Sequence, residues 1–216
     1  MAGKHIVVIG AEHPFADRMC RVWRDEGNAV LAARAGGAGN EAAAGTDELE
    51  RVWFNPLEEA SVRAMAAKAG ETMGRIDLAI ICLDNRKEFA LREGFDSGEA
   101  MELYDYNALG PLRAIEALLP CMGEGSKRIG LLSDVRDSLT EPMGARHLGY
   151  DMSLAARRMS VQIMANALGG EGYTFRAAVL DLEREREEPR EELAAGACRV
   201  LSDLADQEVL RVFRME

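Results

Sequence analysis

The sequence lacks the features that identify disulfide-rich and metal-binding proteins. Its 216 residues include only four cysteines, which form no C-x-x-C pair, and three histidines without metal-ligand spacing. Scattered thiols inside apolar segments are typical of a reducing compartment. We therefore expect buried free thiols, a cytoplasmic location and no metal site. The cysteines are Cys20, Cys82, Cys121 and Cys198, and the histidines are His5, His13 and His147.

Positive charge and long apolar runs are also scarce. Lysine and arginine number 26 against 37 acidic residues, which gives a formal net charge of -11 at pH 7. Such a surplus of acid argues against a broad nucleic-acid surface, although it leaves room for a local basic pocket. No apolar run approaches the roughly 20 residues of a membrane span, and the first residues lack a signal-peptide layout. We expect neither nucleic acid nor membrane as a partner.

The sequence does contain a regular alternation of apolar strands and amphipathic helices. With 48% hydrophobic residues it can bury a sizeable core. Alternation of this kind predicts parallel βαβ units. We predict one α/β domain over residues 1–216, a three-layer Rossmann-like doubly wound sheet of about seven mainly parallel strands with helices on both faces. The predicted strands cover residues 6–9, 29–33, 51–54, 78–83, 128–133, 175–182 and 208–213, and the predicted helices cover residues 15–26, 58–73, 99–122, 150–168 and 191–204.

Two segments show no regular pattern. Residues 35–46 are rich in glycine and alanine and are expected to form a loose loop. Residues 183–188 alternate glutamate and arginine, which indicates a solvated loop or the start of a helix.

The turn after the first strand is the expected place for a ligand, because ligands of such sheets bind outside the carboxyl ends of the strands. Gly10 opens this turn and Pro14 and Ala16 follow it. Proline suits the first turn of a helix but removes a backbone N–H that a phosphate could use. Glu12 adds a carboxylate close to the expected phosphate position. The turn by itself is therefore weak evidence for a nucleotide site.

The spacing of this turn resembles the G-x-x-x-G-x-G motif of the short-chain dehydrogenase/reductase family, with Pro14 and Ala16 in place of its second and third glycines. The resemblance implies a nicotinamide cofactor and assigns Gly10, Ala11 and Phe15 to its binding. Arg34, at the end of the second strand, resembles the basic residue of NADP-preferring members.

The resemblance continues in order along nearly the whole chain. Asn55 stands where the family has an adenine-contacting Asp, and Cys82 begins the C-L-D that replaces the N-A-G motif. Asn107 matches the Asn of the catalytic tetrad. Tyr150, within Y-D-M-S-L-A-A, matches the catalytic tyrosine of Y-x-x-S-K-A-A, which is the most specific signal in the sequence. The catalytic serine position falls on Asp134, so Ser133 and Ser138 are the available hydroxyls.

Leu154 stands where the family has its lysine. That lysine lowers the pKa of the tyrosine and holds the cofactor ribose, and leucine can do neither. Arg157 and Arg158 lie about one turn further along the helix, and we expect them at the surface or in an interface. The segment after the predicted strand 175–182 lacks the family's P-G turn and leaves only a shortened substrate loop.

These losses support two main hypotheses. In the first, the chain is a degenerate family member without standard hydride transfer, whose NADP(H) binding is weak or absent and which acts as a binding or regulatory protein. In the second, it is a divergent NADP(H)-dependent oxidoreductase for a small carbonyl or hydroxyl substrate, with Tyr150 as proton donor and Ser133 or Ser138 orienting the carbonyl. On either hypothesis the substrate is not identified.

A third hypothesis is a subunit role within a hetero-assembly. The two apolar helices, 107–122 and 150–168, form a dimer interface in the family, so the resemblance implies a homodimer or homotetramer.

Overall fold

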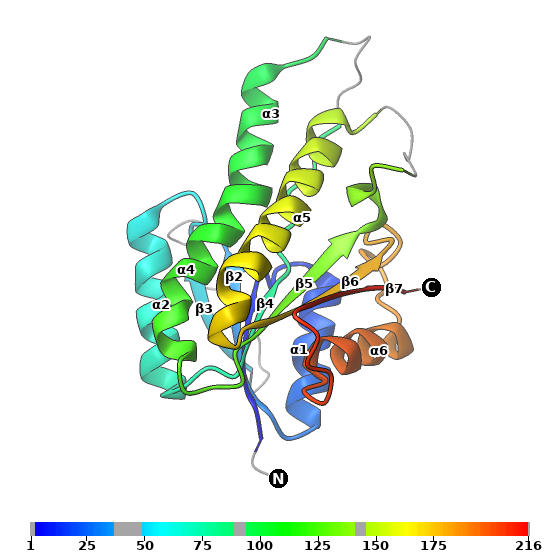
Figure 1. Cartoon of the computed structure of the whole chain (residues 1–216). Coiled ribbons are helices and arrows are strands. Elements are labelled where there is room, and N and C mark those ends of the chain that lie inside the picture. Colours follow the sequence, from blue (N-terminus) through cyan, green and yellow to red (C-terminus); the bar gives the residue numbers. More distant parts are fainter. Residues whose placement is uncertain (1–2, 37–48, 89–93, 141–145, 216) are drawn as a thin grey trace.

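A computed structural model of the chain describes residues 3–36, 49–88, 94–140 and 146–215 (Figure 1). Most of the loop expected at residues 35–46 lies outside the described residues. Within the described residues, no helix is long and apolar enough to cross a membrane.

One sheet of seven parallel strands forms the centre of the fold. The order β3-β2-β1-β4-β5-β6-β7 confirms the predicted doubly wound α/β class, with the direction of winding changing between β1 and β4. The carboxyl ends of β1 and β4 therefore frame the expected ligand position. The strands are β1 (His5–Ile9), β2 (Ala29–Ala35), β3 (Glu50–Phe54), β4 (Leu78–Ile81), β5 (Arg128–Asp134), β6 (Thr174–Leu180) and β7 (Leu210–Arg214).

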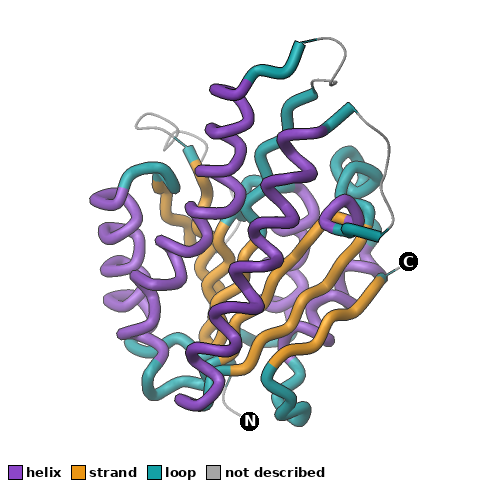
Figure 2. Tube along the Cα trace, turned by 45° about the horizontal axis from the view of Figure 1, so that its top comes forward, coloured by secondary structure: helices purple, strands orange, loops and turns teal. Residues whose placement is uncertain are grey.

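Helices cover both faces of the sheet, as Figures 1 and 2 show. Helices α1 (Pro14–Asp25) and α6 (Glu191–Ser202) pack together on one face, and α2 (Glu59–Met73), α4 (Gly110–Met122) and α5 (Leu148–Leu168) lie on the other. Helix α3 (Ser97–Tyr104) runs beside the first half of α5, beyond the end where the strands terminate. The short turns are η3 (Val135–Asp137) and η4 (Gly169–Glu171).

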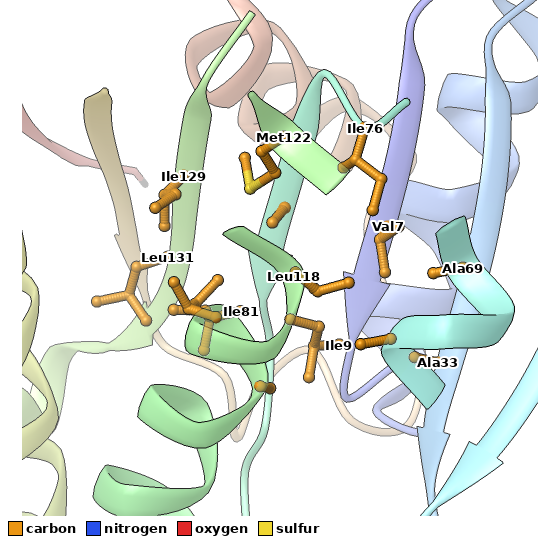
Figure 3. Close-up of a cluster of buried hydrophobic side chains, with 14 of the residues drawn as sticks. Val7, Ile9, Ala33, Ala69, Ile76, Ile81, Leu118, Met122, Ile129 and Leu131 are labelled. Atoms are coloured by element: carbon orange, nitrogen blue, oxygen red, sulfur yellow. The ribbon is translucent and has the colours of Figure 1, made fainter. Parts of the chain in front are cut away.

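The core consists of two apolar layers, one on each side of the sheet. Successive side chains of a strand point to opposite faces, so Val7 and Ile9 of β1 enter one layer while Ile6 and Val8 enter the other. Figure 3 shows part of the layer under α2 and α4, where Leu118 lies close to Ile9. Strands buried on both faces explain why the sequence has continuous apolar runs instead of alternating ones.

The helix expected over residues 99–122 is interrupted. A π-helical turn, η2 (Asp105–Leu109), separates α3 from α4. The expectation of one continuous helix is wrong at this point, because apolar residues on both sides of the turn keep a helical spacing that conceals the change of phase. Turns of this kind are rare and often lie at functional sites.

Two buried arginines hold the connection between α6 and β7. Arg128 at the start of β5 donates to the carbonyl oxygens of Leu201, Asp203 and Asp206. Arg176 of β6 donates to the carbonyl oxygens of Asp206 and Glu208 and pairs with the Asp206 carboxylate at 3.0 Å. The pKa of Arg128 is lowered to about 10 by burial and by the neighbouring Arg176. Arg128 thus satisfies carbonyl groups at the end of α6, and Arg176 satisfies carbonyl groups of the loop that follows it.

Candidate functional site

The turn after β1 lies tightly against β4. Gly10 has a φ of +92°, and a Cβ on it would lie 2.4 Å from the backbone nitrogen of Leu83. The N–H groups of Gly10 and Ala11 both donate to the carbonyl oxygen of Ala33, at 2.8 and 3.1 Å. Two of the N–H groups that a pyrophosphate would need are therefore engaged by the neighbouring strand.

The start of α1 is closed by its own side chains. His13 caps the helix, since its Nδ1 accepts from the N–H of Phe15 at 3.2 Å, and Pro14 has no N–H to offer. Burial lowers the pKa of His13 to about 4. The Phe15 side chain, assigned to the cofactor by resemblance, lies in the core beneath α1. The positive end of the helix is thus covered where an anion would approach.

Glu12 connects this turn to the end of β2. Its carboxylate accepts from the N–H of Ala35 at 2.8 Å and from the hydroxyl of Tyr106 at 3.1 Å. Burial raises the pKa of Glu12. Arg34, expected to read a 2′-phosphate, lies over the ring of Trp53 at 5.4 Å. The same guanidinium also lies 3.8 Å from the Asp17 carboxylate. Its charge is already partly balanced inside the protein.

The remaining residues assigned to a cofactor have local structural contacts. Asn55 holds the start of α2, because its Oδ1 accepts from the N–H of Leu57 and its Nδ2 donates to Glu58. Cys82 follows β4 and is buried, and burial raises its pKa. All four cysteines are free.

Tyr150, in the first turn of α5, meets a carboxylate at the end of β4. The tyrosine is fully buried, and its hydroxyl donates to Asp84 Oδ1 at 2.5 Å. Burial raises the pKa of Tyr150, and the nearby Asp84 and Asp134 raise it further. The second Asp84 oxygen accepts from Arg186, which follows β6, at 2.5 Å. The Tyr150 hydroxyl is therefore shielded from solvent and is a weaker acid than a free phenol.

Arg86 lies over the Tyr150 ring, 4.6 Å from its centroid. Its Nη2 contacts Asp134 of β5 at 3.3 Å, and its Nη1 donates to the Glu183 carboxylate. Burial opposes the charge of Arg86, but Tyr150, Asp134 and Asp84 outweigh it and raise its pKa. Burial raises the pKa of Asp134 to about 6. The polar groups that follow β4, β5 and β6 thus bind one another, in a set that we term the cleft network: Asp84, Arg86, Asp134, Tyr150, Glu183 and Arg186.

Asn107 lies in the π-helical turn and holds the segment after β4. Its Oδ1 accepts from the N–H of Asn85 at 2.8 Å, and its Nδ2 donates to the Asn85 carbonyl and to Ser153 Oγ. Ser153 in turn donates to the Tyr150 carbonyl. Asn107 and Tyr150 are therefore brought together, and every polar group of the Asn107 side chain has a partner inside the protein.

The position of Arg157 differs from the prediction. It was expected at the surface or in an interface, but it is fully buried, and it donates to the Leu83 carbonyl at 2.5 Å and to Ser133 Oγ at 3.2 Å. No carboxylate pairs with it among the described residues. Ser133, the expected catalytic hydroxyl, is buried beneath it, whereas Arg158 is half-exposed and pairs with Asp137 at 2.6 Å.

The sequence analysis missed Arg86, Glu183 and Arg186. The charged block 183–188 is not simply solvated, because two of its side chains enter the cleft network and a third, Glu185, is buried against Arg190. The available signal was position, since the block directly follows β6 at the carboxyl edge of the sheet. Within the described residues no cluster of His, Cys, Asp or Glu is suited to a metal ion.

Comparison with known proteins gives both sequence and structural relatives. The chain is 30% identical over 154 residues to 1-hydroxy-2-glutathionyl-2-methyl-3-butene dehydrogenase of Rhodococcus sp. (strain AD45). It is 33% identical over 79 residues to C-signal of Myxococcus xanthus. These matches cover 71% and 36% of the chain and 66% and 48% of the relatives, less than two thirds of either relative. No family model matches the chain.

The fold also matches solved structures. A short-chain dehydrogenase/reductase from Serratia marcescens superposes with a TM-score of 0.78 at 16% identity, over 98% of this chain and 96% of that one. At this identity the likeness concerns the fold alone.

Proposed function

We propose that the chain is a member of the short-chain dehydrogenase/reductase family whose cofactor cleft is closed by its own side chains. It then acts as a binding or regulatory protein and not by standard hydride transfer. The observation that carries this proposal is the buried hydrogen bond from Tyr150 to Asp84, with Leu154 packed against the same ring.

The environment of Tyr150 does not suit proton transfer to a substrate. A tyrosine that exchanges a proton with a substrate must reach that substrate and must have a pKa near the working pH. Tyr150 is buried, its proton is directed at Asp84, and both the burial and the carboxylates raise its pKa. Leu154 brings no positive charge that could reverse this effect.

The turn after β1 does not suit the binding of a dinucleotide. A dinucleotide would need free N–H groups and an accessible helix start after β1. Gly10 and Ala11 donate to Ala33, His13 caps α1, and the carboxylates of Glu12 and Asp84 lie near the expected phosphate and nicotinamide positions. Both carboxyl groups already accept hydrogen bonds from the protein and offer no donor to an anionic cofactor. The residues present do not fit a nicotinamide dinucleotide.

Titration of the protein with NADPH and NADH, followed by calorimetry, tests the proposal. We expect no saturable binding at concentrations up to about 1 mM, which corresponds to about -4 kcal/mol. A matched variant, Leu154→Lys, restores the family's lysine, and we expect it to remain inactive because Tyr150 still bonds to Asp84. Tight binding of NADPH together with its oxidation by any carbonyl substrate would overturn the proposal.

A second function is supported by the relative that is named a dehydrogenase and by the retained Asn107 and Tyr150. In this alternative the chain is a divergent NADP(H)-dependent oxidoreductase for a small carbonyl or hydroxyl substrate, with Tyr150 as its proton donor. If turnover is found, Tyr150→Phe should abolish it. Unchanged turnover in that variant would remove Tyr150 from the mechanism.

Self-association is part of the same proposal. We infer a homodimer or homotetramer formed through helices 107–122 and 150–168. Support comes from α5, on which Met152, Met159 and Ile163 are each more than half exposed. Exposed apolar side chains of this size on one helix are typical of a protein interface.

A further inference from the structure

We propose that a cavity beside the cleft network binds a small carboxylic acid, whose carboxylate replaces that of Glu183 at Arg86. This inference rests on the proposed function, because it names the ligand of a protein that binds without hydride transfer. The cavity lies where the segment after β6, orange in Figure 1, meets the ends of β4 and β5.

The cavity has a volume of about 250 Å³. A water molecule in the liquid takes up about 30 Å³, so the space suits a compound of about eight non-hydrogen atoms. Its walls come from four segments of the chain and include Arg86, Asp134, Arg136, His147 and Glu183. A dinucleotide is far too large for it, whereas a short mono- or dicarboxylic acid has the right size.

Two buried polar atoms of wall residues have no hydrogen-bond partner within the part of the chain that the structure describes. These atoms are Arg86 Nε and His147 Nδ1, and both are inaccessible to solvent. The His147 side chain as a whole is more than nine-tenths buried. Nearly all buried polar groups in proteins are bonded. Arg86 and His147 therefore line the cavity with part of their hydrogen-bonding capacity unused.

Glu183 already shows what such a ligand would do. Its carboxylate contacts the guanidinium groups of both Arg86 and Arg186, yet its side chain is 58% exposed. Because more than half of the Glu183 side chain is exposed, its carboxylate can exchange with one from solution. The Glu183 side chain can then turn to solvent while the incoming carboxylate takes its place between Arg86 and Arg186.

The other carboxylates of the wall have partners within the protein. Glu88 Oε1 lies 3.7 Å from His147 Nε2. Asp134 accepts from the N–H groups of Arg136 and Leu182 as well as from Arg86. Asp181 accepts from the N–H of Arg184. Arg136, by contrast, has only a long contact of 3.5 Å with Asp151. Its guanidinium is the second position for a carboxylate, so we favour a dicarboxylic acid over a monocarboxylic one.

Calorimetric titration with succinate, at fixed ionic strength because salt screens such contacts, tests the inference. We expect saturable binding at concentrations up to about 10 mM, and none with succinamide, which has the same shape without charge. Glu183→Gln removes the internal competitor and should tighten succinate binding about two- to fivefold. Glu187→Gln, an exposed change in the same segment, is the matched control and should leave binding unchanged.

Arg86→Gln should abolish succinate binding. Because this variant can also disturb the fold, its circular dichroism is compared with that of the wild type, and Arg136→Gln provides a second, less buried test with an expected loss of at least about threefold. No saturable succinate binding in either wild type or Glu183→Gln overturns the inference, as does equal binding of succinamide or tighter binding of inorganic phosphate. A chain that binds NADPH refutes the proposed function whatever succinate does, and a chain that binds neither refutes only this inference.

Discussion

Replacement of Gly10 by alanine tests the close approach that shapes the start of the cleft. Two penalties act on this variant. The φ of +92° costs a residue with a Cβ about 1–2 kcal/mol. The new methyl group would also lie 2.4 Å from Leu83 N and 2.5 Å from the carbonyl carbon of Cys82. Since normal contact begins about 1 Å further out, the turn and the end of β4 must separate.

That separation has its own cost. Forcing extra atoms into a packed region typically costs about 1–3 kcal/mol, and the bond from Cys82 N–H to the Ile9 carbonyl would stretch from 2.6 Å. We therefore expect Gly10→Ala to lower the free energy of unfolding by about 3–5 kcal/mol. Gly27→Ala is the matched control, because Gly27 has a φ of +83° and nothing within 4 Å of its added Cβ. Only the conformational penalty of about 1–2 kcal/mol applies there.

Urea unfolding followed by circular dichroism measures both variants, and an unchanged dependence of the free energy on urea shows that the comparison is sound. The difference between the two losses isolates the contact with β4. Equal losses in Gly10→Ala and Gly27→Ala would refute the reasoning, because the clash would then contribute nothing.

Three further predictions follow from the described contacts. Asp134, 1% exposed, has a folded pKa of about 6 and an ordinary value near 4 in the unfolded chain, so the folded state holds the extra proton between these values. Wild-type stability should therefore fall by about 3 kcal/mol as pH rises from about 4 to about 6, and urea unfolding of Asp134→Asn should lack this component. A wild-type slope equal to that of the variant would contradict the assignment. Arg176→Met should destabilise the protein by about 3 kcal/mol because it leaves a carboxylate and several carbonyls without a donor. Arg211→Met, which removes an exposed partner of the same carboxylate, should cost less than about 1 kcal/mol in the same assay. Light scattering at micromolar concentration should give a dimeric or tetrameric mass that Ile163→Lys reduces and the exposed Leu57→Lys does not, and a monomeric wild type would contradict the proposed interface.

The sequence was sufficient for the arrangement of strands and helices because parallel strands are buried on both faces. The predicted strands 6–9, 78–83 and 128–133 appear as apolar runs for that reason, and their boundaries differ from the structure by at most one or two residues. The π-helical turn could not be predicted, because its five residues do not differ in composition from the helix around them.

The candidate site was predictable only where a motif marks it. Tyr150 and Asn107 were found from spacing, and the structure brings them together through Ser153. The cleft network could not be found from spacing, because Arg86 pairs with Glu183, and Asp84 with Arg186, across about a hundred residues of chain. Arg157 was missed for a different reason: arginine is rarely buried without a carboxylate, so surface exposure is the natural expectation.

The π-helical turn also determines which way α3 faces. Each residue advances an α-helix by about 100°, and a π-helical turn contains one residue more than the α-helix needs. Helix α4 turns its apolar side to α2 and the sheet, whereas α3 turns Ala100 and Leu103 toward Tyr150 and α5. If all five residues 105–109 adopted α-helical geometry instead, α3 would rotate by about 100° about its axis and carry both side chains away from the tyrosine. The phase of one helix thus controls whether the tyrosine ring stays covered.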